Sequence, residues 1–136
     1  MKTRSMISGL LLLALGASMP AVAQENGKRD YLVYCSSCHG VDGRGNGPAV
    51  KVIPGFKPTD LTTLAKRNNG QFPQDEVRDV IDGRKALPGH NDFDTDMPLW
   101  GLQFQEEGKS FSAESEAKVS GRINALIAYI RSIQHD

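Results

Sequence analysis

Cys35-Ser36-Ser37-Cys38-His39 is the stretch that decides what this sequence encodes. Its two cysteines are the only ones in the chain, and a histidine directly follows the second of them. The spacing C-x-x-C-H lets two thiols add to the two vinyl groups of one haem while the adjacent imidazole coordinates the iron. The motif therefore predicts one covalently attached haem c with His39 as an iron ligand.

Three other chemistries use closely spaced cysteines. A thioredoxin-like redox couple would stand beside a β-α-β pattern, which this sequence lacks. A structural zinc site needs four ligands, and no second cysteine pair exists. A plain disulfide between Cys35 and Cys38 fits an oxidising compartment, but it gives no reason for His39 to follow at once. Haem attachment explains all three residues.

The first residues have the composition of an export signal. A positively charged start is followed by a leucine-rich apolar stretch and by Ala21-Val22-Ala23, a small-x-small cleavage site. The apolar stretch is shorter than the ~20 residues that span a bilayer, which favours cleavage over an uncleaved anchor. We expect a cleaved signal peptide over residues 1–23, export to the periplasm, and a mature domain over residues 24–136 without a membrane span.

Cleavage would change the charge of the chain and its methionine content. Lys2 and Arg4 leave with the signal, so the mature chain has fourteen basic and sixteen acidic residues. Its net formal charge is −2 with neutral histidines. Nucleic-acid-binding domains usually carry a basic footprint, so we expect no nucleic-acid partner. Three of the four methionines also lie in the signal, which leaves Met97 as the only one in the mature chain.

Hydrophobic periodicity and cap residues predict helices. The expected helices span residues 27–35, 60–67, 74–82 and 113–134. Asn26 is the expected N-cap of the first, Thr59 or Asp60 that of the second, and Gly83 the stop of the third. The last helix has the clearest pattern, because its apolar residues recur at three- and four-residue steps and form one stripe.

No segment of useful length alternates with the period of a strand. Glycines and prolines gather over residues 40–58 and polar residues over 84–98, so both segments are expected to be long loops. The predicted fold class is all-α, with short helices and long loops wrapped around one covalent haem. Small domains of this kind often need a cofactor to complete the core.

The motifs, taken together, give the mature chain a resemblance to class I c-type cytochromes over nearly all of its length. The matching stretches are Cys35-Ser36-Ser37-Cys38-His39-Gly40, Gly45-Asn46-Gly47-Pro48, Met97-Pro98-Leu99-Trp100-Gly101 and Leu126-Ile127-Ala128-Tyr129-Ile130. The stretch from Ile81 to Gly101 is especially similar to bacterial cytochromes of respiratory chains. The resemblance implies the cytochrome c fold, with His39 and Met97 as axial ligands of the haem iron.

The resemblance also assigns residues outside the haem ligands. The family crosses its first and last helices at a glycine with aromatic residues alongside, and Gly27 with Tyr31 and Leu126 with Tyr129 match this crossing. In the family, the proline of the Gly-Pro pair offers its carbonyl to the ring N–H of the iron-bound histidine. This implies that role for Pro48, with a plain loop proline as the alternative.

Met97 is also a good ligand on chemical grounds. A thioether is a soft, neutral ligand for haem iron, and His/Met ligation raises the reduction potential. Met97 lies in a turn before Pro98 rather than at helical core spacing. His90, in the same loop, is the alternative sixth ligand and would give a bis-histidine haem of lower potential. His135 is expected to be solvated.

Candidates for haem propionate contacts are Arg84, Lys85 and Trp100. A haem with both axial positions filled leaves no coordination site for a substrate, so the sequence predicts an electron carrier rather than an enzyme. Its partners would be donor and acceptor redox proteins that meet it transiently through small interfaces. The protein would be a monomer or part of a respiratory complex. The alternatives are a haem-bearing subunit of a larger dehydrogenase or oxidase and a thiol–disulfide oxidoreductase.

Overall fold

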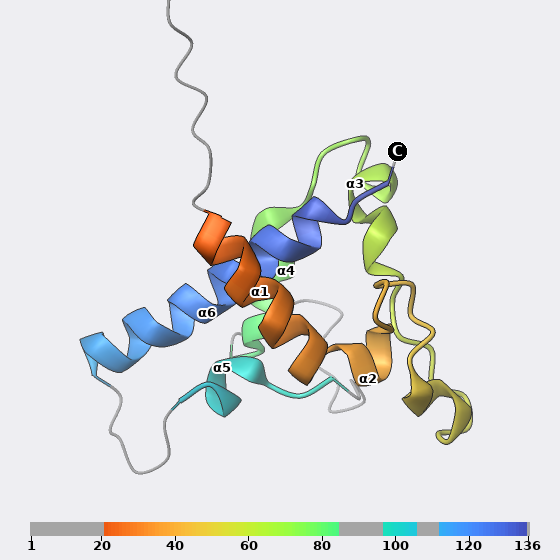
Figure 1. Ribbon diagram of the computed structural model, residues 1–136, viewed down its shortest axis with the longest axis horizontal. Coiled ribbons are helices and arrows are strands. Elements are labelled where there is room, and N and C mark those ends of the chain that lie inside the picture. Colours follow the sequence, from red (N-terminus) through yellow and green to blue (C-terminus); the bar gives the residue numbers. More distant parts are fainter. Residues whose placement is uncertain (1–20, 85–96, 106–111, 136) are drawn as a thin grey trace, which may run out of the picture.

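The structure is a computed structural model that describes residues 21–84, 97–105 and 112–135, with side chains from residue 24 onward (Figure 1). The α-helices of these segments are α1 Ala21–Tyr34, α2 Ser36–His39, α3 Leu64–Arg67, α4 Gln74–Asp82, α5 Trp100–Gln103 and α6 Ala113–Ser132. Two 3₁₀ turns, η1 Pro48–Lys51 and η2 Leu61–Thr63, complete the described elements, among which there is no strand. The all-α fold class is confirmed.

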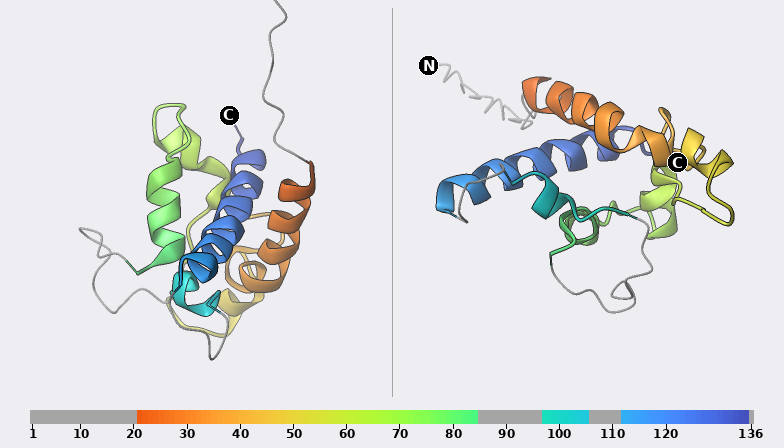
Figure 2. Two further views of the ribbon diagram at one scale, coloured as in Figure 1. Left: turned by 90° about the vertical axis from the view of Figure 1, so that its left-hand side faces the viewer. Right: turned by 90° about the horizontal axis from the view of Figure 1, so that it is seen from below.

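The two longest helices, α1 and α6, pack against each other (Figures 1 and 2). A Cβ atom on Gly27 would lie 2.0 Å from the carbonyl oxygen of Ala125, so any side chain at this position would push the helices apart. The rings of Tyr31 and Tyr129 flank the crossing with their centroids 5.0 Å apart. The crossing expected from the sequence is therefore confirmed, and it fixes the end of α1 that leads into the cysteine motif.

The apolar stripe of α6 is the centre of the core. Figure 2 shows α6 between α1 on one side and α4 on the other. The buried residues of these helices and of the segment after α5 that form the core cluster are Tyr31, Val77, Ile81, Phe104, Val119, Ile123, Leu126, Ile127, Tyr129 and Ile130. Each fully buried aliphatic side chain of this size contributes about 1.5–3 kcal/mol relative to exposure. Burial of this single stripe therefore holds the three helices together.

Two of the expected helix boundaries are confirmed and one is wrong. α4 spans the expected residues and ends at Gly83, whose φ of 67° is the left-handed conformation that glycine adopts without strain. Asp60 caps η2 by accepting the N–H of Thr62 at 2.8 Å. Asn26 is not an N-cap, because α1 begins at Ala21 and runs through it. The residues before Asn26 include alanine, glutamine and glutamate, which favour helix and carry it upstream.

α6 begins at Ala113 as expected and ends at Ser132, two residues earlier than expected, and its N-cap is Ser112, which the sequence analysis did not identify. Ser112 accepts the backbone N–H of Ser115 at 3.2 Å, and the Ser115 hydroxyl in turn accepts the N–H of Ser112 at 3.0 Å. This reciprocal capping box satisfies two N–H groups at the start of the helix. No helix within the described residues combines the length and the apolar character that a membrane crossing requires.

Candidate haem-binding site

One helical turn gathers the residues of the cysteine motif. Cys35 directly follows α1, and α2 spans Ser36–His39. The carbonyl of Cys35 accepts the backbone N–H of Cys38 at 3.2 Å and that of His39 at 2.9 Å. Because residues three and four apart in a helical turn lie on the same side, the two sulfur atoms and the imidazole project from one side of α2.

The environment of the thiols suits a thioether better than a redox couple. Both cysteines are half-buried and free of any disulfide. Burial, followed by the negative charge of Asp30 and the neighbouring Cys38, raises the pKa of the Cys35 thiol to about 12. A reactive dithiol relies on a lowered pKa to form its thiolate, so this position disfavours thiol–disulfide exchange. A thioether carries no charge and fits the half-buried position.

The imidazole of His39 is oriented by one hydrogen bond. Its Nδ1 lies 2.9 Å from the carbonyl oxygen of Thr59, an acceptor, so the proton of the ring sits on Nδ1. Burial lowers the pKa of His39, while the hydrogen bond to Thr59 acts in the opposite direction. A neutral imidazole that donates from Nδ1 keeps the lone pair of Nε2 for a metal, as iron-ligating histidines require. The free thiols of the motif and the Nδ1–H tautomer of His39 are therefore both suited to binding haem c.

The structure gives the His39 hydrogen bond to Thr59, which corrects the role expected of Pro48. Pro48 opens the 3₁₀ turn η1, and the carbonyls of such a turn bond residues within it. The preceding Gly47 holds this loop to α2 instead, because its N–H donates to the carbonyl of Cys38 at 3.1 Å. A Cβ at Gly47 would also lie 2.3 Å from the carbonyl oxygen of Ser37. The sequence pointed to Thr59 only as a possible helix cap.

The profile of the family described as cytochrome c matches residues 24–107, more than half of the chain. The chain belongs to the cytochrome c family. No curated protein and no solved structure matches it. Membership of the family means that the protein carries covalent haem c and takes part in haem-based electron transfer. With a single C-x-x-C-H motif, the chain has attachment chemistry for one haem.

Met97 is the first residue of the described segment 97–105, which packs against the core of this cytochrome. It is partly buried and contacts the core cluster. Three residues later, the ring of Trp100 lies 5.5 Å from those of Tyr34 and Phe104, and these two rings are also 5.5 Å apart. Since three residues of chain span at most roughly 10 Å, this aromatic cluster keeps Met97 near the end of α1, where Cys35 follows. His90, the other candidate ligand, lies outside the described residues.

An ion pair between a buried aspartate and a partly exposed arginine lies beside the aromatic cluster of the cytochrome. The Nε of Arg122, on α6, donates to the carboxylate of Asp30, on α1, at 2.9 Å. Asp30 is buried, and the guanidinium of Arg122 lies 3.9 Å from the centroid of the Phe104 ring. Removing Arg122 would leave the buried charge of Asp30 without its partner. The pair therefore ties the segment that carries Met97 to both long helices.

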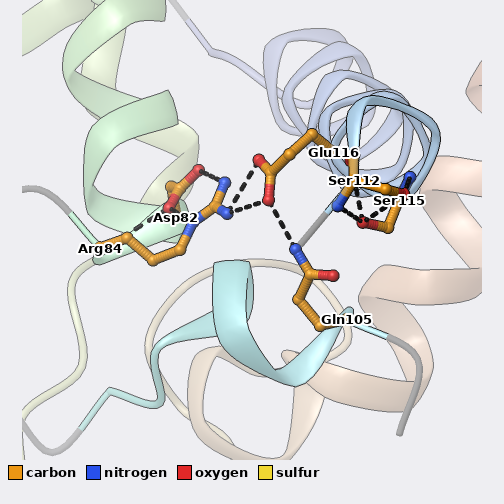
Figure 3. A network of polar contacts seen from close by, with 6 residues as sticks. All are labelled: Asp82, Arg84, Gln105, Ser112, Ser115 and Glu116. Atoms are coloured by element: carbon orange, nitrogen blue, oxygen red, sulfur yellow. Dashed lines mark hydrogen bonds and ion pairs between the residues drawn. The ribbon is translucent and has the colours of Figure 1, made fainter. Parts of the chain in front are cut away.

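Arg84, a candidate for a propionate contact, is paired with two protein carboxylates (Figure 3). Its Nε and Nη2 donate to the two oxygens of Asp82 at 2.6 and 2.8 Å, and its Nη1 donates to Glu116 at 2.7 Å. These hydrogen bonds, that to Asp82 first, raise the pKa of Arg84. Gln105 also donates to Glu116 at 2.6 Å, so the network joins α4 and α6 to the segment after α5.

The remaining candidates from the sequence fall into two groups. Trp100 belongs to the aromatic cluster described above, whereas Lys85 lies outside the described residues. Within the part of the chain that the structure describes, no three histidine, cysteine, aspartate or glutamate side chains come together as a metal site.

Proposed function

We propose that this cytochrome is a periplasmic one-electron carrier whose haem is bonded to Cys35 and Cys38 and whose iron is ligated by His39 and Met97. The observation that carries the proposal is the turn of α2, which puts both free thiols and an Nδ1-protonated imidazole on one side. Met97 supports the second ligand because it is partly buried and is the only thioether downstream of the expected signal.

Each residue has a separate task in electron transfer. The haem supplies iron that alternates between the ferrous and ferric states. The Thr59 carbonyl holds the Nδ1–H of His39 and so fixes the plane of the ring and its basicity. A thioether ligand from Met97 favours the ferrous state and raises the reduction potential. The packing of α1 against α6 fixes the end of α1 that leads into the cysteine motif.

A redox titration with a ligand-binding assay tests the carrier function. The holoprotein should titrate as a single one-electron couple, and its reduced form should not bind carbon monoxide, because both axial positions are filled. Rapid carbon monoxide binding by the unmodified protein would show an open coordination site and contradict the proposal. The native mass after mild extraction should equal that of a monomer. A larger mass would instead identify a subunit of a dehydrogenase or oxidase.

We infer that residues 1–23 are removed on export. The small-x-small site ends at Ala23, and the family match begins at the next residue. Removal would shorten α1 by three residues and leave the crossing at Gly27 intact. The periplasmic fraction should contain a chain that begins at Gln24 and carries the mass of one haem. Ala23→Leu should block cleavage, whereas Gln24→Ala should not. An intact Met1 terminus on the unmodified protein would contradict the inference.

A further inference from the structure

The chain beyond α6 returns to the segment that contains the His39 acceptor. Gln134 uses both ends of its amide: Oε1 accepts the backbone N–H of Ala65 at 2.9 Å, and Nε2 donates to the carbonyl of Leu61 at 2.6 Å. Nε2 also donates to the carbonyl of Ile130, at 2.8 Å, which anchors the amide to the last turn of α6. One side chain thus bridges the C-terminal helix, η2 and the first turn of α3.

A backbone hydrogen bond reinforces this bridge. The N–H of His135 donates to the carbonyl of Thr62 at 2.8 Å. Gln134 and His135 thus bind three residues of the segment that directly follows Thr59. These residues are Leu61, Thr62 and Ala65. The C-terminal residues therefore hold this segment from one side over two successive turns.

The loop after α2 holds the same segment from the other side. The N–H of Leu61 donates to the carbonyl of Gly43 at 2.7 Å. Gly45 approaches so closely that a Cβ there would lie 2.4 Å from the carbonyl oxygen of Pro58. Gly45 also donates its N–H to the carbonyl of His39 at 2.8 Å. The segment that follows Thr59 is therefore held on one side by the loop after α2 and on the other by Gln134 and His135.

The side chain of Thr59 is exposed and makes none of these hydrogen bonds. The position of its carbonyl is set by its neighbours, Pro58 against Gly45 and Leu61 against Gly43 and Gln134. Loss of the hydrogen bond from Gln134 would leave Leu61 with only its bond to Gly43. Because hydrogen bonds weaken steeply with angle and distance, a small shift of the Thr59 carbonyl weakens its bond to His39.

We propose that Gln134 is a positioning residue for the haem ligand His39, acting through Leu61 and the carbonyl of Thr59. The inference rests on the proposed role of His39 as iron ligand. A strong Nδ1–H···O bond makes an imidazole more basic and so stabilises ferric iron. Loss of the Gln134 bridge weakens that bond, and the reduction potential then moves to more positive values.

The experiment compares Gln134→Leu with Ser112→Ala in the holoprotein. Leucine keeps the approximate volume of glutamine but makes none of its three hydrogen bonds. Ser112→Ala removes the cap at the opposite end of α6 and destabilises the same helix without contacting the Thr59 segment. NMR measures exchange of the His39 ring N–H and of the Ala65 amide, and a redox titration gives the potential of each variant.

Gln134→Leu should speed exchange of the His39 ring proton by roughly tenfold, as the loss of one hydrogen bond's net free energy does, and should raise the potential. Ser112→Ala should lower the thermal stability by a similar amount but leave the exchange rate of the His39 ring proton and the reduction potential unchanged. Loss of protection at Ala65 with an unaltered His39 proton and potential would overturn the proposal, as would equal shifts in both variants. If Gln134→Leu fails to retain haem, Gln134→Glu tests the Leu61 bond alone, because it keeps the acceptor for Ala65 and loses the donor to Leu61, and exchange of the His39 ring proton is then the deciding measurement.

The unmodified protein separates this proposal from the one on which it rests. A ring N–H of His39 that shows the large paramagnetic shift of an iron ligand in the oxidised protein supports the ligand role, whatever the variants do. Its absence would contradict that ligand role and the positioning role together. Its presence with silent Gln134 variants would contradict the positioning role alone.

Discussion

Replacing both Cys35 and Cys38 with alanine should abolish all haem that resists acid–acetone extraction. The two sulfur atoms are the only thiols in the chain, and no other side chain can form a thioether with a vinyl group. Haem staining after denaturing electrophoresis and the pyridine haemochrome spectrum measure the bound haem. The expected loss is complete in the double variant and partial in each single variant, since one thioether bond then remains.

The motif offers a matched control for this experiment. Ser36 and Ser37 lie between the cysteines, and replacing both with alanine changes two side chains of the same turn while keeping both sulfurs. The Ser36 hydroxyl donates only to the carbonyl of Leu32 on α1, and that of Ser37 contacts the Cys38 sulfur at 3.8 Å. The serine variant should retain covalent haem. Covalent haem in the cysteine variant would show that the attachment site is wrong.

The double cysteine variant should also fold poorly. A domain of this size rarely stabilises itself by secondary structure alone and often depends on a bound cofactor to complete its core. Far-ultraviolet circular dichroism should show reduced helix, and the thermal transition should broaden or vanish. The serine control should keep the helix signal of the unmodified protein.

Local signals made much of the helical scaffold predictable from the sequence. Gly83 marks the end of α4 because a left-handed residue there favours glycine, and the structure confirms it. The stripe of α6 could be read from three- and four-residue spacing, because one buried face of a helix leaves that period in the sequence. The glycine crossing at Gly27 followed from the family resemblance and is confirmed by its contact with Ala125.

Polar contacts between distant segments could not be predicted in this way. The acceptor of the His39 proton is Thr59, twenty positions away along the chain, and the partner of Asp30 is Arg122, ninety-two positions away. Such pairs leave no period in the sequence, because each involves one residue from each segment. Arg84 shows the same limit: its charge suggested a propionate contact, whereas the fold brings Glu116 to it from α6.

The residues of the candidate site also differ in how far the sequence alone could predict them. The proposed haem attachment residues Cys35, Cys38 and His39 lie within one short motif, so their spacing alone was enough to propose them. The residues that orient the ligands are contributed by other elements and emerge only from the fold. The sixth ligand stands between these cases, because Met97 has a chemical argument and a family resemblance but no contiguous motif to fix it.

Met97→Ala should remove the weak long-wavelength absorption band that a sulfur–iron(III) bond gives to the oxidised protein. It should also lower the reduction potential by on the order of 0.1 V, a fraction of the roughly 0.8 V range over which axial ligands act. With the thioether gone, the iron should bind cyanide when oxidised and carbon monoxide when reduced. Absorption spectra, a redox titration and ligand-binding kinetics measure the three effects.

Two further variants decide whether Met97 or His90 is the ligand. Leu99→Ala changes an exposed apolar residue of the same segment and should keep the band, which shows that the effect belongs to the sulfur rather than to loosening of the segment. His90→Ala should also keep the band and change the potential only slightly. If His90→Ala instead alters the spectrum while Met97→Ala does not, the haem is bis-histidine. A bis-histidine haem has a lower potential, so the protein would then serve a lower-potential step of electron transfer.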